Sequence, residues 1–363
     1  MKKLLFLLPF MAIAATGING CSQDKRVRLT YGTLVGDKAE ELEYGELATK
    51  VGRGENMLVA VYQDGLPCGC WSTFHEVLDQ YVAEYDTKAY YIASSQFSDE
   101  SDKFGLTILK GTSDPTFALI KDGKKVNEYI YGKDTKPMFQ TLSGLRKVVK
   151  KIAKDPQYFY VDQEYLDNAL FTTKEDVVVH YIWYFCPDCN DCFPEVLLPY
   201  SKNNNLSKKI WIMDLAIEGL LIEHGTINKN SPGYIEFLHD HKMSSYEGNE
   251  ELGYDRGFVP TTQYWHNGEL VDMNVYFNDA VSKNDEGQYV LSRSYYSEER
   301  VQHLGYTNEV LQGKILPEEQ VNVSVNSETG VESYSWKMDY ARLYHKPILE
   351  AFLNKYVKQE KEA

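Results

Sequence analysis

The sequence of 363 residues predicts an α/β protein in which one plan of strands and helices occurs twice. Two apolar runs of strand composition, Met57 to Gln63 and Val177 to Phe185, each lead into a cysteine-containing turn and a helical pattern. Further along each half, a proline (Pro115 and Pro260) opens an apolar strand and a hairpin. The order of elements therefore repeats, although residue identity between the halves is low.

Composition and charge indicate a globular protein and limit the partners that it is expected to bind. A hydrophobic fraction of 43% and a charged fraction of 25% are globular values, and the length suits two ordinary domains. The formal net charge is −15. This balance argues against nucleic acid as a partner and shows no basic, membrane-seeking face.

The N-terminus has the pattern of a targeting segment. Lys2 and Lys3 precede an apolar run over residues 4–15 and a stretch of small residues that ends at Cys21. The apolar run is too short to span a membrane. The segment resembles a bacterial lipoprotein signal, which is cleaved before a cysteine that then receives lipid. The resemblance implies a membrane-anchored lipoprotein at the cell surface or periplasmic face, with plain secretion as the alternative. Both place the mature protein outside the cytoplasm, where disulfides persist.

The first half shows each expected element in turn. After the first strand comes Cys68-Gly69-Cys70-Trp71, and helical spacing of apolar residues follows. The remaining elements are a helix near 44–51, a strand over 89–94, a proline strand and hairpin over 114–124, and a helix over 135–153.

The second half carries the more specific motif. The buried strand ends at Cys186-Pro187-Asp188-Cys189, and Pro187 suits the first turn of a helix. At a helix N-terminus, unpaired N–H groups and the dipole stabilise a thiolate at Cys186. Cys189, one turn on, is near enough to close a disulfide. The charge of Asp188 should raise the thiol pKa.

At these residues the chain resembles the thioredoxin-like superfamily. The shared motifs are the C-x-x-C after a hydrophobic strand and a proline loop with a hairpin at Asn267-Gly268. The resemblance implies a central mixed sheet flanked by helices, with Pro260 as a cis-proline beside the dithiol and Pro115 as a second cis-proline in the first half. It also implies that the backbone of Val259 pairs with substrate as an added strand. It covers most of the chain from about Leu29 to Val357.

Two residues depart from the family pattern. Phe185 stands where a tryptophan usually precedes the first cysteine, and His180 stands where many members have a buried acid that transfers protons. His180 is either a proton shuttle or a hydrogen-bonded core histidine. Tyr184 and Phe185 are expected to pack first and to help dock peptides second.

The C-x-C of the first half is one residue shorter than the family motif. A disulfide between Cys68 and Cys70 would close a small, strained ring that is easily reduced. The alternatives are a redox site that includes Pro115, a structural or vestigial pair, and a metal site. Trp71 is a candidate for substrate binding.

Cys192 extends the second motif to three thiols. It is interpreted as a buried small hydrophobe, as a resolving thiol for Cys189, or as a zinc ligand together with His180. Beyond a redox-active disulfide, the sequence shows no flavin, haem or nucleotide site, and zinc is the minor alternative.

The resulting organisation has four parts. They are a lipoprotein-type signal peptide at 1–21, a tether at 22–28, a thioredoxin-like domain at 29–153 and a second one at 154–363. The second domain is enlarged by insertions near 215–255 and 278–335, which are either binding surfaces or mobile loops.

The resemblance implies extracytoplasmic thiol–disulfide exchange on protein or peptide thiols and disulfides, together with a membrane redox partner. Cys186 would attack and Cys189 would resolve the mixed disulfide. The alternative is a membrane-tethered binding or scaffold lipoprotein whose cysteines are inert.

Overall fold

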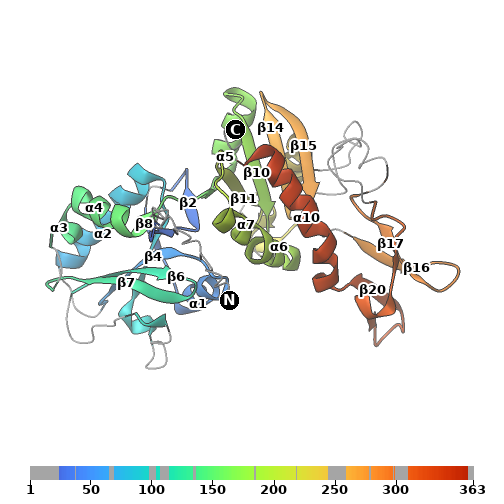
Figure 1. Cartoon of the computed structure of the whole chain (residues 1–363), viewed down its shortest axis with the longest axis horizontal. Helices are drawn as coiled ribbons and strands as arrows, with labels where there is room; N and C mark the ends of the chain where they lie inside the picture. Colours follow the sequence, from blue (N-terminus) through green and yellow to red (C-terminus); the bar gives the residue numbers. More distant parts are fainter. Residues whose placement is uncertain are drawn as a thin grey trace, which may run out of the picture.

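A computed structural model gives the structure of the chain (Figure 1). It describes residues 24–36, 38–64, 69–97, 104–106, 114–133, 136–183, 185–217, 219–243, 259–277, 279–296, 298 and 310–358. Cys21, Cys68 and Tyr184 lie outside these residues. Within the described ranges, no helix combines the length and the apolar character that crossing a membrane requires.

The first unit is built on a five-stranded mixed sheet in the order β3-β5-β4-β6-β7. Its strands are β3 (Glu40–Glu41), β4 (Met57–Tyr62), β5 (Ala89–Ala93), β6 (Thr116–Lys121) and β7 (Lys124–Ile130). Side chains alternate along β4, so Leu58 packs with α2 (Gly69–Tyr85) and α4 (Leu142–Ile152) on one face, while Val59 packs with α1 (Tyr44–Gly52) on the other.

The second unit is built on a six-stranded sheet in the order β15-β14-β10-β11-β9-β2. Its strands are β2 (Tyr31–Thr33), β9 (Tyr158–Tyr160), β10 (Val177–Ile182), β11 (Ile210–Asp214), β14 (Thr261–His266) and β15 (Glu269–Val275). On one face lie α6 (Pro187–Cys192), α7 (Leu198–Asn203) and α10 (Met338–Tyr356), and on the other α5 (Gln163–Asp167) and α8 (Pro232–Asp240). The predicted fold class, a mixed sheet flanked by helices, is confirmed.

The cores of the two sheets share one geometry. In each, the central strand pairs in parallel with the next strand and antiparallel with the hairpin strand, and both hairpins have strands of 6 and 7 residues. Both hairpin turns place two residues at positive φ, Asp122-Gly123 and Asn267-Gly268, as tight hairpins require. The backbone N–H of Tyr131 donates to Pro115 O at 3.1 Å, and that of Tyr276 donates to Pro260 O at 3.0 Å.

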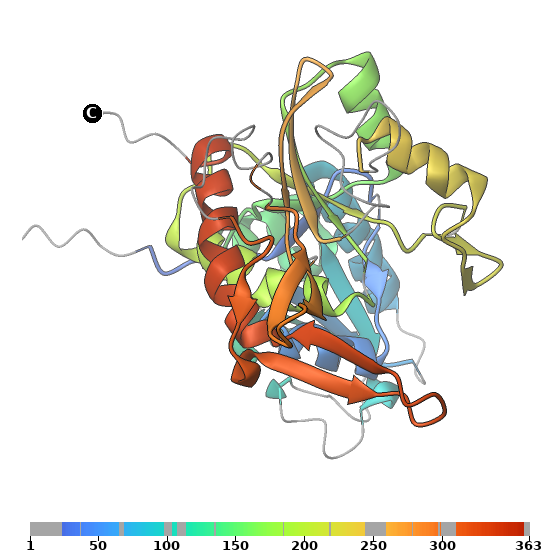
Figure 2. The ribbon, with the colours of Figure 1, turned by 90° about the vertical axis from the view of Figure 1, so that its right-hand side faces the viewer.

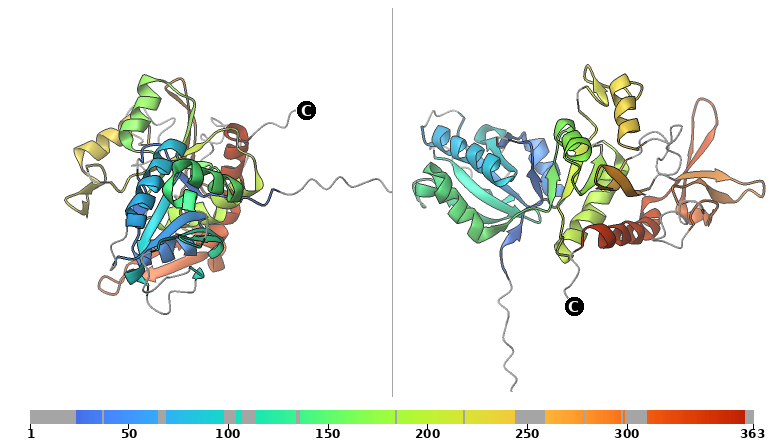
Figure 3. Two further views of the ribbon diagram at one scale, coloured as in Figure 1. Left: turned by 90° about the vertical axis from the view of Figure 1, so that its left-hand side faces the viewer. Right: turned by 90° about the horizontal axis from the view of Figure 1, so that it is seen from above.

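The two units are joined by a strand, β2, whose pairing the sequence did not indicate. β2 precedes the first sheet in the chain but pairs in parallel with β9, at the edge of the second sheet. A Cβ on Gly32 would lie 2.3 Å from Asp86 O, so this crossing needs glycine. Lys202 pairs with Asp122 across the units at 2.8 Å. The units lie side by side in Figure 3.

Two further elements differ from the sequence expectation. The helix expected over 135–153 is two helices, α3 (Lys136–Gln140) and α4, because Thr141 is extended and its hydroxyl caps α4 by accepting from the N–H of Gly144. The short strand β1 (Val27–Arg28) lies in the expected tether and pairs with β8 (Ala153–Lys154), which spans the expected boundary between the two domains.

The segment 278–335, which showed little periodicity, forms short antiparallel strands (Figure 2). They are β16 (Ala280–Lys283), β17 (Tyr289–Arg293), β18 (Ile315–Leu316), β19 (Val321–Val325) and β20 (Glu332–Trp336). Residues 321–325 alternate valine with polar residues, as a strand does in sequence, but Val323 and Val325 are exposed and only Val321 is buried. The earlier insertion contains β12 (Ile222–Glu223), β13 (Thr226–Ile227) and α8.

Candidate functional site

Cys186 lies between the end of β10 and the start of α6. It is the N-cap residue of that helix, with Pro187 at the first helical position, as the sequence predicts. Its backbone N–H donates to Trp183 O at 2.9 Å, and its Sγ donates to Val259 O at 3.4 Å. The side chain is 8% exposed. One thiol therefore sits at the helix end and against the backbone of the proline loop.

Cys189 lies one turn on, inside the helix and 5% exposed. Its Sγ accepts the N–H of Trp183 at 3.4 Å. Burial raises its pKa well above the usual thiol range. By contrast, a hydrogen bond from Cys189 and the backbone N–H groups of Cys189 and Asp188 lower the pKa of Cys186 to about 7, against the opposing effect of burial. The two thiols are thus unequal: Cys186 is poised as a thiolate and Cys189 as a thiol.

The proline loop closes one side of the dithiol. The Val259–Pro260 peptide bond is cis, as the sequence predicts. Pro260 O accepts the N–H of Tyr276, which fixes the loop to the end of β15. Val259 is partly buried and packs on the apolar layer beneath α8. Its carbonyl is held beside Cys186 Sγ by these anchors.

A charge from the 215–255 insertion also acts on Cys186. Lys229 lies between β13 and α8, and its Nζ is 5.6 Å from the centre of the Trp183 ring. Its positive charge contributes to the low pKa of the Cys186 thiol. Sequence reasoning missed this residue, because nothing in its local pattern ties it to the dithiol.

Asp188, between the two cysteines, is itself perturbed. Burial and the negative charges of Cys186, Asp191 and Asp279 raise the pKa of its carboxyl to about 7. Asp188 and Cys186 therefore titrate in the same pH range and influence each other.

The last helix, α10, is tied to α6 through a partly buried ion pair. Arg342 of α10 donates to both carboxylate oxygens of Asp191, with Nε at 3.1 Å from each. Tyr276 Oη donates to Asp191 Oδ2 at 3.2 Å. The Asp191 side chain is 6% exposed and that of Arg342 is 25% exposed. α10 thus neutralises a carboxylate two residues beyond Cys189.

His345, one turn after Arg342, forms a second pair on the same helix. Its Nε2 lies 2.6 Å from Asp279 Oδ2, and the two side chains are 1% and 3% exposed. A histidine on the apolar side of an amphipathic helix was the sequence signal that could have pointed to this pair.

His180 lies on β10, on the face that packs against α6. Its Nδ1 is 2.8 Å from Thr262 Oγ1, while its Nε2 is buried and has no hydrogen-bond partner among the described residues. Burial lowers its pKa to about 3. The ring is therefore neutral at ordinary pH, which favours the core interpretation over the proton shuttle.

The other residues predicted near the second dithiol differ in how far their side chains are exposed to solvent. Phe185 is 67% exposed at the rim of the site, so it is available to a peptide and does not pack in the core. Tyr184 lies outside the described residues. Cys192 is fully buried in an apolar cluster with Phe193 and Val196, as a small hydrophobe would be. Cys186, Cys189 and Cys192 are free thiols.

The helix that carries the thiols changes winding beyond Cys192. A π-helical segment, Phe193–Leu197, separates α6 from α7. Pro194 and Pro199 lack the N–H groups that an α-helix would use here, so the helix widens.

The first half presents a different arrangement. Cys70 is disulfide-bonded, and Cys68 lies outside the described residues. Trp71 is stacked between Tyr62 and His75, with ring centroids 4.6 and 5.2 Å away. The Asp114–Pro115 bond is not among the cis bonds of the described chain, so the expectation of a second cis-proline is wrong.

The described residues contain no group of three or more His, Cys, Asp or Glu side chains arranged to hold a metal ion.

Comparison with known proteins gives a partial likeness. No protein-family model matches the sequence, and no curated protein matches it either. Among solved structures, a thioredoxin mutant from Halobacterium salinarum is 18% identical and covers 34% of this chain and 97% of its own, with a TM-score of 0.26. A thioredoxin from Schistosoma mansoni is 22% identical and covers 32% and 95%, with a TM-score of 0.24. Zinc-bound human ERp44 is 14% identical and covers 49% of this chain, which matches 45% of that protein, with a TM-score of 0.24. The neighbours have the thioredoxin fold and match only part of the chain.

Proposed function

We propose that the chain is a pair of thioredoxin-like domains that carries out thiol–disulfide exchange outside the cytoplasm. The observation that supports this most is the pair of unequal thiols at the start of α6. Cys186 has a pKa lowered to about 7 and touches Val259 O, while Cys189 is buried behind it with a raised pKa. This asymmetry is what a nucleophile and a resolving thiol require.

The reaction in the reducing direction has two steps. The Cys186 thiolate attacks one sulfur of a peptide disulfide, forming a mixed disulfide and releasing one substrate thiolate. Cys189 then loses its proton and attacks Cys186 Sγ. This releases the second substrate thiolate and leaves the Cys186–Cys189 disulfide, so two electrons pass to the substrate. A membrane dithiol partner returns the enzyme to the reduced state, and the reverse sequence oxidises a substrate dithiol.

Each neighbouring group has a role in this scheme. The backbone of Val259 pairs with the extended substrate beside the reacting sulfur, and exposed Phe185 contacts the peptide. Asp188, whose pKa lies near that of Cys186, accepts the proton that Cys189 gives up. His180, with a pKa of about 3, is a poor acceptor near neutral pH.

The setting is part of the proposal. Cys21 carries lipid, so the protein is anchored to a membrane and acts on thiols or disulfides at the cell surface or periplasmic face. The C-x-C half is an accessory domain whose aromatic stack around Trp71 contacts substrate.

The test is turnover of a fluorescent peptide disulfide with a small dithiol as the reductant. The native chain should turn over substrate, and Cys186→Ser should not. Cys189→Ser should trap the mixed disulfide, which is detectable by mass. A native chain that neither turns over substrate nor interconverts Cys186–Cys189 between dithiol and disulfide would refute exchange and favour a tethered scaffold. Zinc measurement on protein made without chelator separates the metal alternative.

A further inference from the structure

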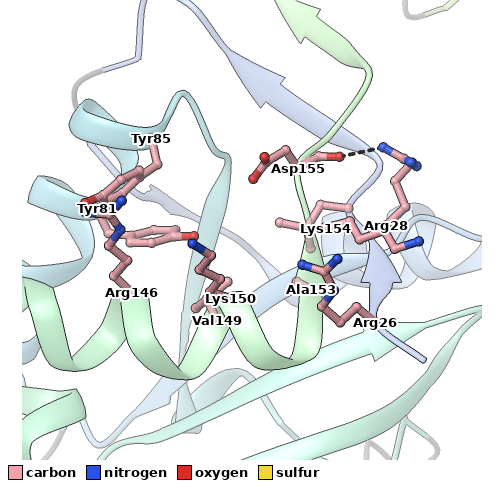
Figure 4. Close-up of a pocket in the computed structure, with 11 residues that line it drawn as sticks. Arg26, Arg28, Tyr81, Tyr85, Arg146, Val149, Lys150, Ala153, Lys154 and Asp155 are labelled. Atoms are coloured by element: carbon pink, nitrogen blue, oxygen red, sulfur yellow. Dashed lines mark hydrogen bonds between the residues drawn. The ribbon is translucent and has the colours of Figure 1, made fainter. Parts of the chain in front are cut away.

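The first unit contains a basic pocket far from the dithiol in sequence (Figure 4). It is a cavity of about 370 Å³, within the size range of small-ligand sites. It lies between α2, α4 and the paired strands β1 and β8. Its lining is Arg26, Arg28, Leu29, Tyr81, Tyr85, Arg146, Val149, Lys150, Ala153, Lys154 and Asp155.

The pocket has an apolar floor and a cationic wall. Leu29, Val149 and Ala153 are buried and form part of its floor. Two of the cations, Arg26 and Lys154, are paired with Asp24, at 2.7 and 3.1 Å. Arg26, Arg146 and Lys150 are exposed, so a bound anion can reach their charged groups.

Three other cations have no ion pair among the described residues, although the charges of Asp155 and Asp24 act on Arg28. In the described part of the chain, Arg28, Arg146 and Lys150 make no ion pair with a carboxylate. Arg28 donates to the backbone oxygen of Asp155 at 3.1 Å, and Arg146 lies over the Tyr85 ring at 4.8 Å. The Asp155 carboxylate is the acidic group in the lining, so the pocket keeps an excess of positive charge in a chain of net charge −15.

Burial acts on this charge as well. It lowers the pKa of Arg28, because desolvation disfavours the cation. An anion in the pocket would restore the electrostatic stabilisation that the Arg28 cation loses on leaving water. The half-buried guanidinium therefore favours anion binding more than a fully solvated guanidinium would.

The pocket lies close to Cys21 along the chain, since Arg26 follows Cys21 by five residues. Asp24, the first described residue, is three residues after Cys21, and three extended residues span at most about 11 Å. Arg26, just before β1, and Arg28, on β1, both line the pocket. A lipid on Cys21 would therefore hold this pocket close to the membrane surface.

From these observations we propose that the pocket lined by Arg28, Arg146 and Lys150 binds the phosphoryl headgroup of an anionic phospholipid. The cations contact the phosphate oxygens, and the pocket fixes how the first unit lies on the membrane. The inference rests on the proposed anchor at Cys21 but not on the dithiol chemistry. It also corrects the view from composition, because a chain with a large negative charge can still carry a local basic site.

The test uses the full chain with Cys21→Ser, so that no lipid anchor contributes to binding. Co-sedimentation is measured with phosphatidylcholine vesicles and with vesicles that also contain phosphatidylglycerol, at low ionic strength. Binding should require phosphatidylglycerol. Removing two pocket charges with Arg146→Gln and Lys150→Gln should weaken it by roughly tenfold or more, since each charge near a membrane counts for about fivefold.

The matched control removes two charges from the same helix outside the pocket. Lys147 and Lys151 are exposed residues of α4 that do not line the cavity. Lys147→Gln with Lys151→Gln has the same net charge as the pocket variant and should keep most of the vesicle binding. Equal loss in both variants would show diffuse attraction and would overturn the site.

Two further arms complete the design. Titration with inorganic phosphate separates the lipid from a soluble ester: phosphate binding without vesicle binding would overturn the lipid assignment. Peptide-disulfide turnover, measured on the same variants, should be unchanged by the pocket substitutions. Cys186→Ser should bind vesicles as the parent does, so failure of the dithiol proposal and failure of this one are distinguishable.

Discussion

The two halves of the chain share a four-stranded core but differ at the end of the central strand. In the second half, β10 ends beside an N-capping Cys186 with a pKa lowered to about 7, and a cis proline loop faces that thiol. In the first half, Cys70 is already disulfide-bonded and the Asp114–Pro115 peptide bond is not cis. The matched hairpins show that the sheet geometry persists without the dithiol geometry.

The chemistry of the second half depends on elements that the first half lacks. Lys229 comes from the 215–255 insertion, and Arg342 and His345 come from α10. These groups set the charge around the active-site helix from outside the repeated core. The pKa of Cys186 is set first by Cys189 and by the backbone N–H groups of its own helix turn, and the additions adjust the charge around that turn.

The largest contrast is expected between the two sets of cysteines. Cys186→Ser removes the attacking thiolate and should lower peptide-disulfide turnover by at least roughly three orders of magnitude. Cys70→Ser should leave most of the turnover. If Cys70→Ser were the more damaging variant, the assignment of the two halves would be reversed.

The next effect concerns stability. Arg342→Met leaves the buried Asp191 carboxylate unpaired, so the free energy of unfolding of the second unit should fall by about 2–4 kcal/mol. Asp339, an exposed partner of Arg342, provides the control: Asp339→Asn should cost about 0.5 kcal/mol or less. Chemical denaturation followed by tryptophan fluorescence measures both. Equal costs would remove the claim that α10 holds the active-site helix.

Asp188→Asn should act on both pKa and stability. Losing the neighbouring carboxylate should lower the pKa of Cys186 by up to about one unit. The native pKa of Asp188 is raised to about 7, so its contribution to stability is present at low pH and is lost as pH rises through 7. The variant should therefore be more stable than the parent at pH 8, by about 1–2 kcal/mol, and nearly equal to it at pH 3. A constant difference across this range would contradict the coupling.

The smallest expected effect belongs to Lys229. Lys229→Gln should raise the Cys186 pKa by a few tenths of a unit, because the charge of Lys229 lowers that pKa less than the local hydrogen bonds do. Lys202→Gln, which removes an exposed charge from the junction of the units, is the control and should leave that pKa unchanged. The rate of alkylation as a function of pH reports the shift.

Much of the fold could be predicted because the signals are local. The hairpin at Asn267-Gly268 and the start of α6 at Pro187 follow from turn and helix-start chemistry, and both are confirmed. The short strands within 278–335 were not predicted, although valine alternates with polar residues over 321–325; Val323 and Val325 are exposed, so that alternation marks no buried face. Strand β2 could not be placed either, because pairing between distant segments leaves no mark in local sequence.

The site divides in the same way. Cys186, Cys189 and Pro260 carry a motif, and the structure brings Cys186 against the backbone just before Pro260. Arg342 and Asp191 are far apart in the chain, and neither belongs to a motif, so their pairing emerges only from packing. His180 was identified by position in the strand, but its protonation depends on burial, which gives it a pKa of about 3.

The central claim is that Cys186 is the reactive thiol of the chain, and alkylation of the reduced protein across pH with mass mapping of the label tests it most directly. Label should appear first on Cys186, with a midpoint at about pH 7, while Cys189 should stay unlabelled until much higher pH. Earlier labelling of Cys189 or Cys70, or a Cys186 midpoint at the ordinary thiol value of about 8.5, would contradict the account.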